Sequence, residues 1–272
     1  MPDSAATPIV SSRMYNLSPT IRGLWDDFFL WLCGETGIEL RIVAHAAPLP
    51  LPELWQRPDM GAVFMCGYPF SKMAPDERPV ALAAPVSVAA WGHGKPVYAS
   101  HIVTGRRSTI DRADLGSARW GWTVRDSQSG YHAPRAYLAG LPDVRLTGET
   151  VGPLLNPAGM VEAIDTGRIE VGAIDAYTYQ LLEMHEPDTV SSLRIVATTE
   201  PAPCPLLVAA RQQPADTVSA LRRALLTAHL GDAGRAILKP LGLSGFAEPD
   251  LADYDRLPAR AQEADRALGV TW

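Results

Sequence analysis

A cluster of small polar residues at the predicted start of a helix is the stretch of this sequence best suited to hold a ligand. In RDSQSGYHAPRAYLAG, residues 125–140, Ser127, Gln128 and Ser129 offer hydrogen-bond donors, and Gly130 lets a ligand approach the backbone. A helix N-terminus adds N–H groups and the positive end of the helix dipole, which favour anions. The pattern predicts an oxyanion site at these four residues; the alternative is a helix N-cap without a ligand.

Sequence patterns of catalytic and metal chemistry are missing. A nucleophile elbow needs G-x-S-x-G, but Ser127 and Tyr131 flank Ser129 at the glycine positions, and Arg125 and Ser129 flank Ser127. The six histidines show no H-x-x-x-H spacing and the three cysteines no C-x-x-C, so we expect no metal. No G-x-G-x-x-G or Walker A loop occurs, so we expect no cofactor.

Three further residues are candidates for the same ligand site. Asp175 ends the strand-like run VGAID, and an acid at the carboxyl end of a parallel strand faces the binding crevice. Tyr68 follows the apolar run GAVFMC, and Tyr15 ends the first strand-like run; tyrosine suits ligand pockets because it combines an apolar face with a hydroxyl. The alternatives are a helix N-cap for Asp175 and core packing for both tyrosines.

Strand-like and helical runs alternate along the chain, which predicts an α/β fold with parallel sheets. Two extended, proline-flanked segments, residues 95–104 and 197–210, are predicted to cross between two lobes. Lobe 1 would contain residues 8–98 plus 202–272, and lobe 2 residues 99–201. A cleft between two α/β lobes is a common ligand site, and helix N-termini at strand ends face it.

Composition narrows the classes of partner. The 272 residues carry a net charge of -6, so the chain offers no electrostatic reason to expect nucleic-acid binding. The N-terminal segment lacks the basic start and apolar stretch of a signal peptide, and no uninterrupted apolar run reaches the roughly 18 residues of a membrane span. We expect a chain that either stays in the cytoplasm or has lost an export signal.

Three segments together resemble a known family. The first, YASHIVTGRRSTIDRADLGSARWGWTVRDSQSGYHAPRAYLA, is similar to the core of phosphate/phosphite/phosphonate-type ABC transporter solute-binding proteins, with a Tyr-x-Ser crossing and an S-x-S-G-Y turn opening a helix. MVEAIDTGRIEVGAIDAYTYQLLEMHEP and CGYP match two further segments. The resemblance covers roughly residues 9 to 240, and residues 99–201 carry its more specific part.

The resemblance implies a type II periplasmic-binding-protein fold, with two α/β lobes joined by two crossing strands and a ligand cleft between them. It places Ser127, Gln128 and Ser129 on the oxyanion and Asp175, Tyr68 and Tyr15 at cleft-facing positions. Gln128 replaces the threonine of a Ser-Thr-Ser turn, Pro157 stands where a histidine is common, and Cys66 replaces a tyrosine. These departures widen the expected ligands to carboxylates, sulfonates and neutral molecules.

The function that follows is that of a non-enzymatic solute-binding protein with a small oxyanion as ligand and an ABC permease as partner. The family implies a periplasmic location. One alternative is a cytosolic sensor or an enzyme on the same fold, such as a thiamin-pyrimidine-synthesis-like protein, although the cysteine cluster of those proteins is absent. An enzyme could instead use Cys66 as nucleophile and His132 as base. Another is a degenerate interaction module without a ligand.

Overall fold

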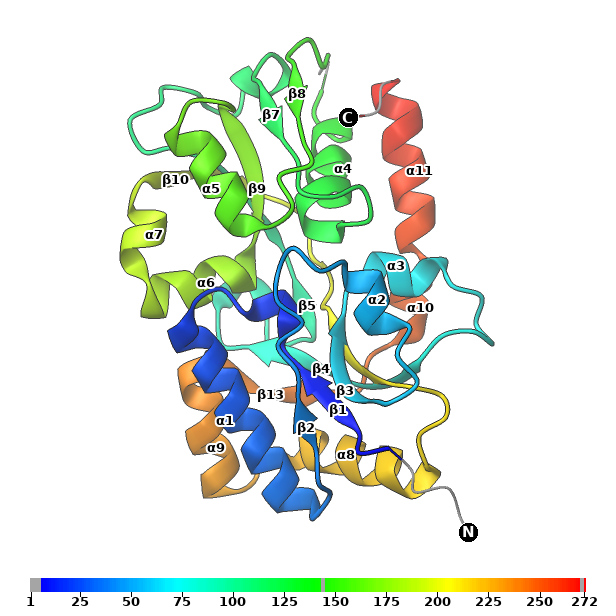
Figure 1. Cartoon of the computed structure of the whole chain (residues 1–272). Coiled ribbons are helices and arrows are strands. Elements are labelled where there is room, and N and C mark those ends of the chain that lie inside the picture. The colour runs from blue at the N-terminus through cyan, green and yellow to red at the C-terminus, as the bar shows by residue number, and fades with distance from the viewer. Residues whose placement is uncertain (1–5, 143–144, 270–271) are drawn as a thin grey trace. The chain divides into compact units, whose positions relative to one another are not determined.

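A computed structural model describes residues 6–142, 145–269 and 272. The chain divides into two compact units, and the elements of each are labelled in Figure 1. Unit 1 takes the chain up to Cys66 and then Met73–Pro96 and Cys204–Asp250. Unit 2 takes Gly67–Lys72, Val97–Pro203 and the chain from Leu251 on.

Unit 1 is built on a mixed six-stranded sheet in the order β13-β4-β12-β3-β1-β2. Its strands are β1 (Ile9–Ser11), β2 (Arg41–Ile42), β3 (Met60–Met65), β4 (Val80–Ser87), β12 (Leu206–Ala209) and β13 (Leu243–Ala247). Its α-helices are α1 (Pro19–Thr36), α2 (Leu51–Trp55), α8 (Ala215–Thr227) and α9 (Asp232–Leu238). Every residue of β3 is buried, which is typical of an apolar strand covered on both faces.

Helix α1 shows how local sequence signals set an element of unit 1. The hydroxyl of Ser18 accepts a hydrogen bond from the N–H of Ile21 at 3.2 Å, Pro19 occupies the first turn, and Gly37 ends the helix with a φ of 67°. Both ends of the helix thus follow from residues within one turn of them. The buried face of the helix includes Trp25 and Phe28, which pack edge to face with ring centroids 5.5 Å apart.

Unit 2 is built on a mixed five-stranded sheet in the order β10-β6-β9-β7-β8. Its strands are β6 (Ser100–Gly105), β7 (Trp120–Gly121), β8 (Thr150–Val151), β9 (Val171–Asp175) and β10 (Leu193–Thr198), with β5 (Val97–Tyr98) and β11 (Ala202–Pro203) in a separate pair. Its helices are α3 (Gly67–Lys72), α4 (Ala133–Ala139), α5 (Pro157–Asp165), α6 (Ala176–His185), α7 (Pro187–Ser191), α10 (Leu251–Asp255) and α11 (Leu257–Leu268).

The prediction of parallel sheets is wrong, because both sheets are mixed. In each unit, one strand from a predicted crossing segment pairs antiparallel with both of its neighbours. In unit 1 this strand is β12, which lies between β3 and β4. In unit 2 it is β6, which lies between β10 and β9. Two neighbouring strands run parallel when a helix connects them in a right-handed crossover. The chain enters β12 and β6 directly from the other unit, without such a helix, so these strands can pair antiparallel with their neighbours.

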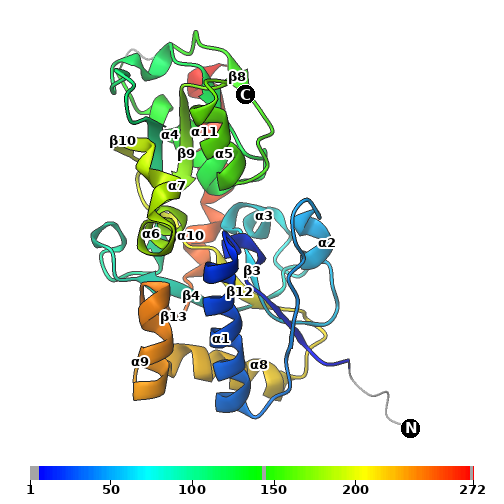
Figure 2. The same cartoon turned by 60° about the vertical axis from the view of Figure 1, so that its left-hand side comes forward.

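The units depart from the expected lobes in two places. Residues 67–72 and the chain from Leu251 on belong to unit 2, whereas the sequence placed both with lobe 1. The reason is packing within unit 2: α10 and α11 contact α3, and α11 also contacts α4, beside which it runs in both views (Figures 1 and 2). The two predicted crossing segments each contain a passage of the chain between the units, and β5 and β11 pair there.

Two apolar clusters fill unit 2. One gathers around Trp120, Trp122 and Tyr131 and includes the C-terminal Trp272, whose ring stacks on Trp120 with centroids 5.1 Å apart. The other gathers around Met160 of α5 and strands β6 and β9. None of the described helices is long and apolar enough to cross a membrane.

Candidate functional site

The polar turn at residues 127–132 is a single π-helical turn, η4 (Gln128–His132), that leads directly into α4. Its backbone bonds join residues five apart: the N–H of His132 donates to the carbonyl of Ser127 at 3.1 Å, and the N–H of Ala133 donates to that of Gln128. Turns of this kind are rare and occur frequently at functional sites. The turn packs against β9, the strand that ends at Asp175.

Ser127 is the N-cap of this turn. Its hydroxyl oxygen accepts a hydrogen bond from the N–H of Gly130 at 2.9 Å. The helix-cap alternative is therefore the geometry that Ser127 adopts, while its hydroxyl proton stays available to a further acceptor. Ser129 is half-buried in the same turn.

Gln128 has the most unusual environment of the four predicted residues. Its side chain is 7% exposed, and its carboxamide oxygen Oε1 has no hydrogen-bond partner among the described residues. An unpaired buried polar atom costs about 1–3 kcal/mol and is uncommon in native proteins. The sequence suggested a donor at this position, whereas the buried atom without a partner is an acceptor.

Gly130 has no room for a side chain, because it lies against Thr123, a residue that the sequence analysis did not identify. A Cβ atom at this glycine would lie 2.2 Å from Oγ1 of Thr123. The backbone also holds the two residues together, since the N–H of Thr123 donates to the carbonyl of Gly130 at 3.3 Å. Thr123 is 7% exposed, and its hydroxyl has no partner among the residues that the structure describes.

Tyr68 and His132 form the aromatic part of the site. Their rings stack with centroids 3.6 Å apart and an angle of 28° between the planes. His132 is 8% exposed; its imidazole makes a hydrogen bond to the backbone of Arg125, and its Nε2 has no partner within the described ranges. Burial lowers the pKa of His132 to about 4, so the ring is neutral at neutral pH. Burial also raises the pKa of Tyr68, with a smaller contribution from Asp126.

Asp175 caps helix α6. Its Oδ1 accepts hydrogen bonds from the N–H groups of Tyr177 at 2.8 Å and Thr178 at 2.9 Å. Burial raises the pKa of Asp175 to about 7, although these two hydrogen bonds act in the opposite direction. The structure thus shows the helix-cap role, and the carboxyl group titrates near neutral pH.

Tyr15 lies apart from these residues, in unit 1. It is 1% exposed and packs against Trp25 and edge to face against Phe64, with ring centroids 6.1 Å and 5.0 Å apart. Its ring packs as a core tyrosine does. Cys66 is also buried in unit 1, whereas His132 belongs to unit 2.

Unit 2 therefore brings together Tyr68 and the four turn residues and adds Thr123 and His132. Sequence reasoning proposed His132 only as a catalytic base and did not propose Thr123. One local signal was available for His132, because it stands four residues after Gln128 in a helical segment. No local signal pointed to Thr123, which precedes the turn and meets it only through tertiary packing.

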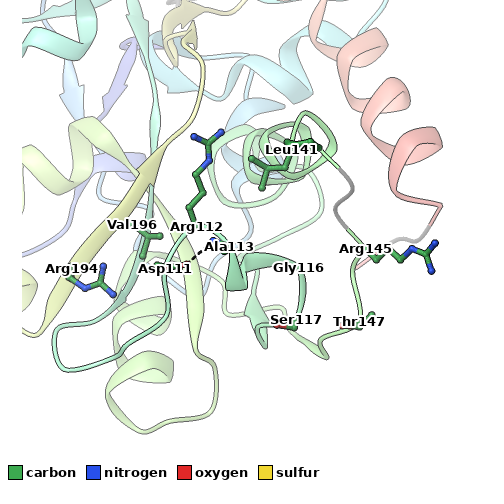
Figure 3. Close-up of a pocket in the computed structure, with 11 residues that line it drawn as sticks. Asp111, Arg112, Ala113, Gly116, Ser117, Leu141, Arg145, Thr147, Arg194 and Val196 are labelled. Atoms are coloured by element: carbon green, nitrogen blue, oxygen red, sulfur yellow. Dashed lines mark hydrogen bonds between the residues drawn. The ribbon is translucent and has the colours of Figure 1, made fainter.

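Elsewhere in unit 2, a hollow with a volume of about 1020 Å³ has several arginines in its lining. Arg112, Arg145 and Arg194 contribute to it, and in Figure 3 the three side chains point away from one another. Arg194 is engaged with the backbone, donating to the carbonyl of Ile110 at 2.6 Å, and the guanidinium of Arg112 lies 5.6 Å from the ring of Tyr137. The arginines do not converge on one anion, so the turn is the better candidate site.

Comparison with known proteins places the chain among transport proteins. A family model described as "ABC transporter, phosphonate, periplasmic substrate-binding protein" matches residues 15–254. No curated protein matches the chain in sequence.

Solved structures with the same fold include three informative ones. A binding protein component of an ABC phosphonate transporter from Pseudomonas aeruginosa is 18% identical with a TM-score of 0.73, covering 96% of this chain and 89% of its own. PhnD1 from Prochlorococcus marinus, solved with methylphosphonate, is 14% identical with a TM-score of 0.72, covering 96% and 97%. An R. palustris protein solved with adipate is 13% identical with a TM-score of 0.60, covering 97% and 98%. These matches show a type II periplasmic-binding fold for this chain.

Proposed function

Because the chain belongs to the phosphonate-type periplasmic substrate-binding family of ABC transporters, we propose that its turn at residues 127–130 holds a small oxyanion for delivery to a membrane permease. The chain is a solute-binding protein and not an enzyme, since members of this family are substrate-binding components of transporters. The alternative with Cys66 as nucleophile is not favoured.

One observation carries the proposal for the turn. Gln128 is buried, and its side-chain oxygen lacks a partner within the described part of the chain, in the same turn as two serines and a glycine. An unpaired buried acceptor in a native protein calls for an explanation, and an O–H of the ligand, such as that of a singly protonated acid group, would supply the missing donor. The free hydroxyl proton of Ser127 and the hydroxyl of Ser129 would donate to the oxygens of the bound acid.

The stacked rings of Tyr68 and His132 provide an apolar surface beside these polar groups. Tyr68 stacks on His132 within unit 2, and the imidazole lies in the same turn as Ser127 and Ser129. Ligand pockets commonly combine such apolar surfaces with a few placed polar groups. We propose Tyr68 as the side chain that covers the apolar part of the solute.

Asp175 has a carboxyl group whose pKa is raised to about 7. When this group is ionised, it is proposed to accept a hydrogen bond from a hydroxyl or amine of the ligand.

The chemical class of the acid is wider than phosphonates. Pro157 occupies the first turn of α5 behind the N-cap Asn156, so this position offers no imidazole and no N–H donor to a phosphonate. The structural neighbours with methylphosphonate and with adipate support testing phosphonates and carboxylates side by side.

A thermal-shift screen tests the proposal. The protein is scanned with phosphate, methylphosphonate, sulfate, ethanesulfonate and acetate, and saturation at about 100 Kd should stabilise it by roughly 2.7 kcal/mol. We expect one class of acid to raise the Tm of the wild type, and the double variant Ser127→Ala/Ser129→Ala to lose that increase.

The matched control is Ser219→Ala, the same change at an exposed serine of α8. It should keep the full shift. If no acid raises the Tm of the wild type, or if the double variant responds as the wild type does, the turn is not the oxyanion site.

A further inference from the structure

Arg13 lies at the carboxyl end of β1 in unit 1, whereas the polar turn belongs to unit 2. It opens the 3-10 turn η1 (Arg13–Tyr15), which follows β1 after a single residue. β1 pairs in parallel with β2 on one side and with β3 on the other, and the chain runs from β1 to β2 and then to β3. The strand order therefore reverses at β1. In α/β sheets, ligands bind outside the carboxyl ends of the strands at such a reversal.

The turn that carries Arg13 is held by the strands beside it. The N–H of Arg13 donates to Oγ of Ser11, the last residue of β1, at 3.3 Å. The N–H of Tyr15 donates to the carbonyl of Ser12 at 2.7 Å. The ring of Tyr15 packs edge to face against Phe64 of β3, with centroids 5.0 Å apart. The backbone under Arg13 is thus fixed, which suits a residue that must present its side chain to a ligand in one geometry.

The guanidinium of Arg13 has no hydrogen bond and no ion pair with any of the described residues. Its Nε is buried, whereas Nη1 and Nη2 are not. Burial lowers the pKa of Arg13, and no carboxylate among these residues opposes the effect. The side chain is therefore a cation that has lost part of its hydration without gaining a counter-ion, and its two terminal nitrogens remain accessible.

Three other arginines of unit 1 show how a half-buried guanidinium is satisfied within a protein. Arg57, Arg78 and Arg222 are half-buried as Arg13 is. Arg57 pairs with a carboxylate, and Arg78 and Arg222 each donate to a backbone carbonyl. Taking a charge out of water without such a partner is unfavourable. Arg13 differs from all three, and an anionic ligand would supply the partner that it lacks.

The accessible end of this guanidinium defines the class of anion. Nη1 and Nη2 form a planar fork that can donate two parallel hydrogen bonds to two oxygens of one acid group. Carboxylates, phosphonates, sulfonates, phosphate and sulfate all present such a pair of oxygens, and chloride presents none. A small oxyanion is therefore the ligand whose shape and charge fit Arg13.

We propose that Arg13 is an anion-binding residue of unit 1 and that its Nη1 and Nη2 hold the acid group of a small oxyanion. This assignment goes beyond the proposed function, because it concerns a different unit and uses no property of the polar turn. It also gives the segment after β1 a ligand contact that Tyr15, whose ring packs in the core, does not supply.

Isothermal titration calorimetry of the full chain tests the proposal. The protein is titrated at pH 7.5 with phosphate, methylphosphonate, sulfate, ethanesulfonate and acetate, in a Tris-chloride buffer that keeps an anion without paired oxygens always present. We expect at least one oxyanion to bind the wild type. Its Kd should rise tenfold or more in Arg13→Met, which keeps the apolar stem and removes the charge. Arg13→Lys keeps the charge without the fork and should recover part of the affinity.

Two further variants make the result specific. Arg223→Met removes an exposed arginine of α8 in the same unit and changes the net charge by the same amount. It should bind the oxyanion as the wild type does. If circular dichroism shows that Arg13→Met does not fold, Arg13→Gln replaces it and should show the same loss of affinity.

The double variant Ser127→Ala/Ser129→Ala separates this proposal from the proposed function. Binding that is lost in Arg13→Met and kept in the serine variant supports Arg13 and overturns the turn as the oxyanion site. An affinity that is unchanged in Arg13→Met, or that falls equally in Arg223→Met, overturns the role of Arg13; the proposed function then stands if the serine variant loses binding. If none of the five oxyanions binds the wild type, both proposals fail.

Discussion

Arg135 of α4 and Asp265 of α11 form an ion pair across 130 residues of sequence, with Nη2 of the arginine 2.7 Å from Oδ1 of the aspartate. The arginine side chain is 1% exposed and the aspartate 45%. The guanidinium also lies 5.4 Å from the ring centroids of both Tyr131 and Trp272. One side chain thus ties the helix that follows the polar turn to the C-terminal helix.

Replacing this arginine should destabilise the protein. Arg135→Met removes a buried charge-assisted hydrogen bond and two cation–π contacts, and we expect a loss of roughly 3 kcal/mol in the free energy of unfolding. Urea unfolding followed by circular dichroism measures it. The control is Arg256→Met, which removes a pair with Asp253 whose partners are 70% and 46% exposed; it should cost less than about 1 kcal/mol. Equal losses would show that the Arg135 pair is an ordinary surface contact.

The contact between Gly130 and Thr123 predicts a steric defect that can be repaired. Gly130→Ala should destabilise by about 1–3 kcal/mol, because the new methyl would overlap Oγ1 of Thr123. Adding Thr123→Ala removes the nearest two atoms and should restore part of the loss in the same unfolding assay. Gly23→Ala, where a Cβ meets nothing within 4 Å in α1, should leave stability unchanged or raise it. A harmless Gly130→Ala would contradict the packing described here.

Asp175 should make the protein less stable as the pH rises. Its folded pKa of about 7 exceeds the ordinary value of 3.8, so the folded state prefers the protonated acid. That preference is fully present below pH 3.8 and is lost as the pH rises through 7. Asp175→Asn keeps an N-cap oxygen and cannot ionise. Relative to this variant, the wild type should lose on the order of a few kcal/mol between pH 4 and pH 8. Parallel pH profiles in thermal unfolding would argue against a raised pKa.

His132 should have the opposite effect on stability. Its folded pKa of about 4 lies below the ordinary 6.5, so its neutral form is favoured in the folded state. The stability from this preference is fully present above pH 6.5 and falls as the pH drops toward 4. The difference in unfolding free energy between the wild type and His132→Phe should therefore shrink or reverse from pH 7 to pH 4.5. A difference that does not change with pH would show that His132 is not held neutral.

Local features of this protein could be read from the sequence because their causes lie within a few residues. Ser18, Pro19 and Gly37 set the ends of α1 through one side-chain hydrogen bond, one fixed dihedral angle and one left-handed residue. The apolar run that became β3 and the S-x-S-G turn before α4 are equally local. The family itself was evident from such short motifs.

Tertiary structure alone decided which distant residues meet. Tyr68 reaches His132 because α3 belongs to the same compact unit as the polar turn, although the chain leaves that unit and returns between them. The same holds for α11, whose contacts with α3 and α4 place the C-terminal segment in unit 2. The contact of Thr123 with Gly130 and the burial of the His132 ring follow from that packing. Helix caps and hydrophobic periodicity act over one or two helical turns, so the sequence by itself determined the helices, the strands and the polar turn. The order of the strands and the burial of side chains depend on the whole chain. The folded units therefore determined which side chains surround the turn.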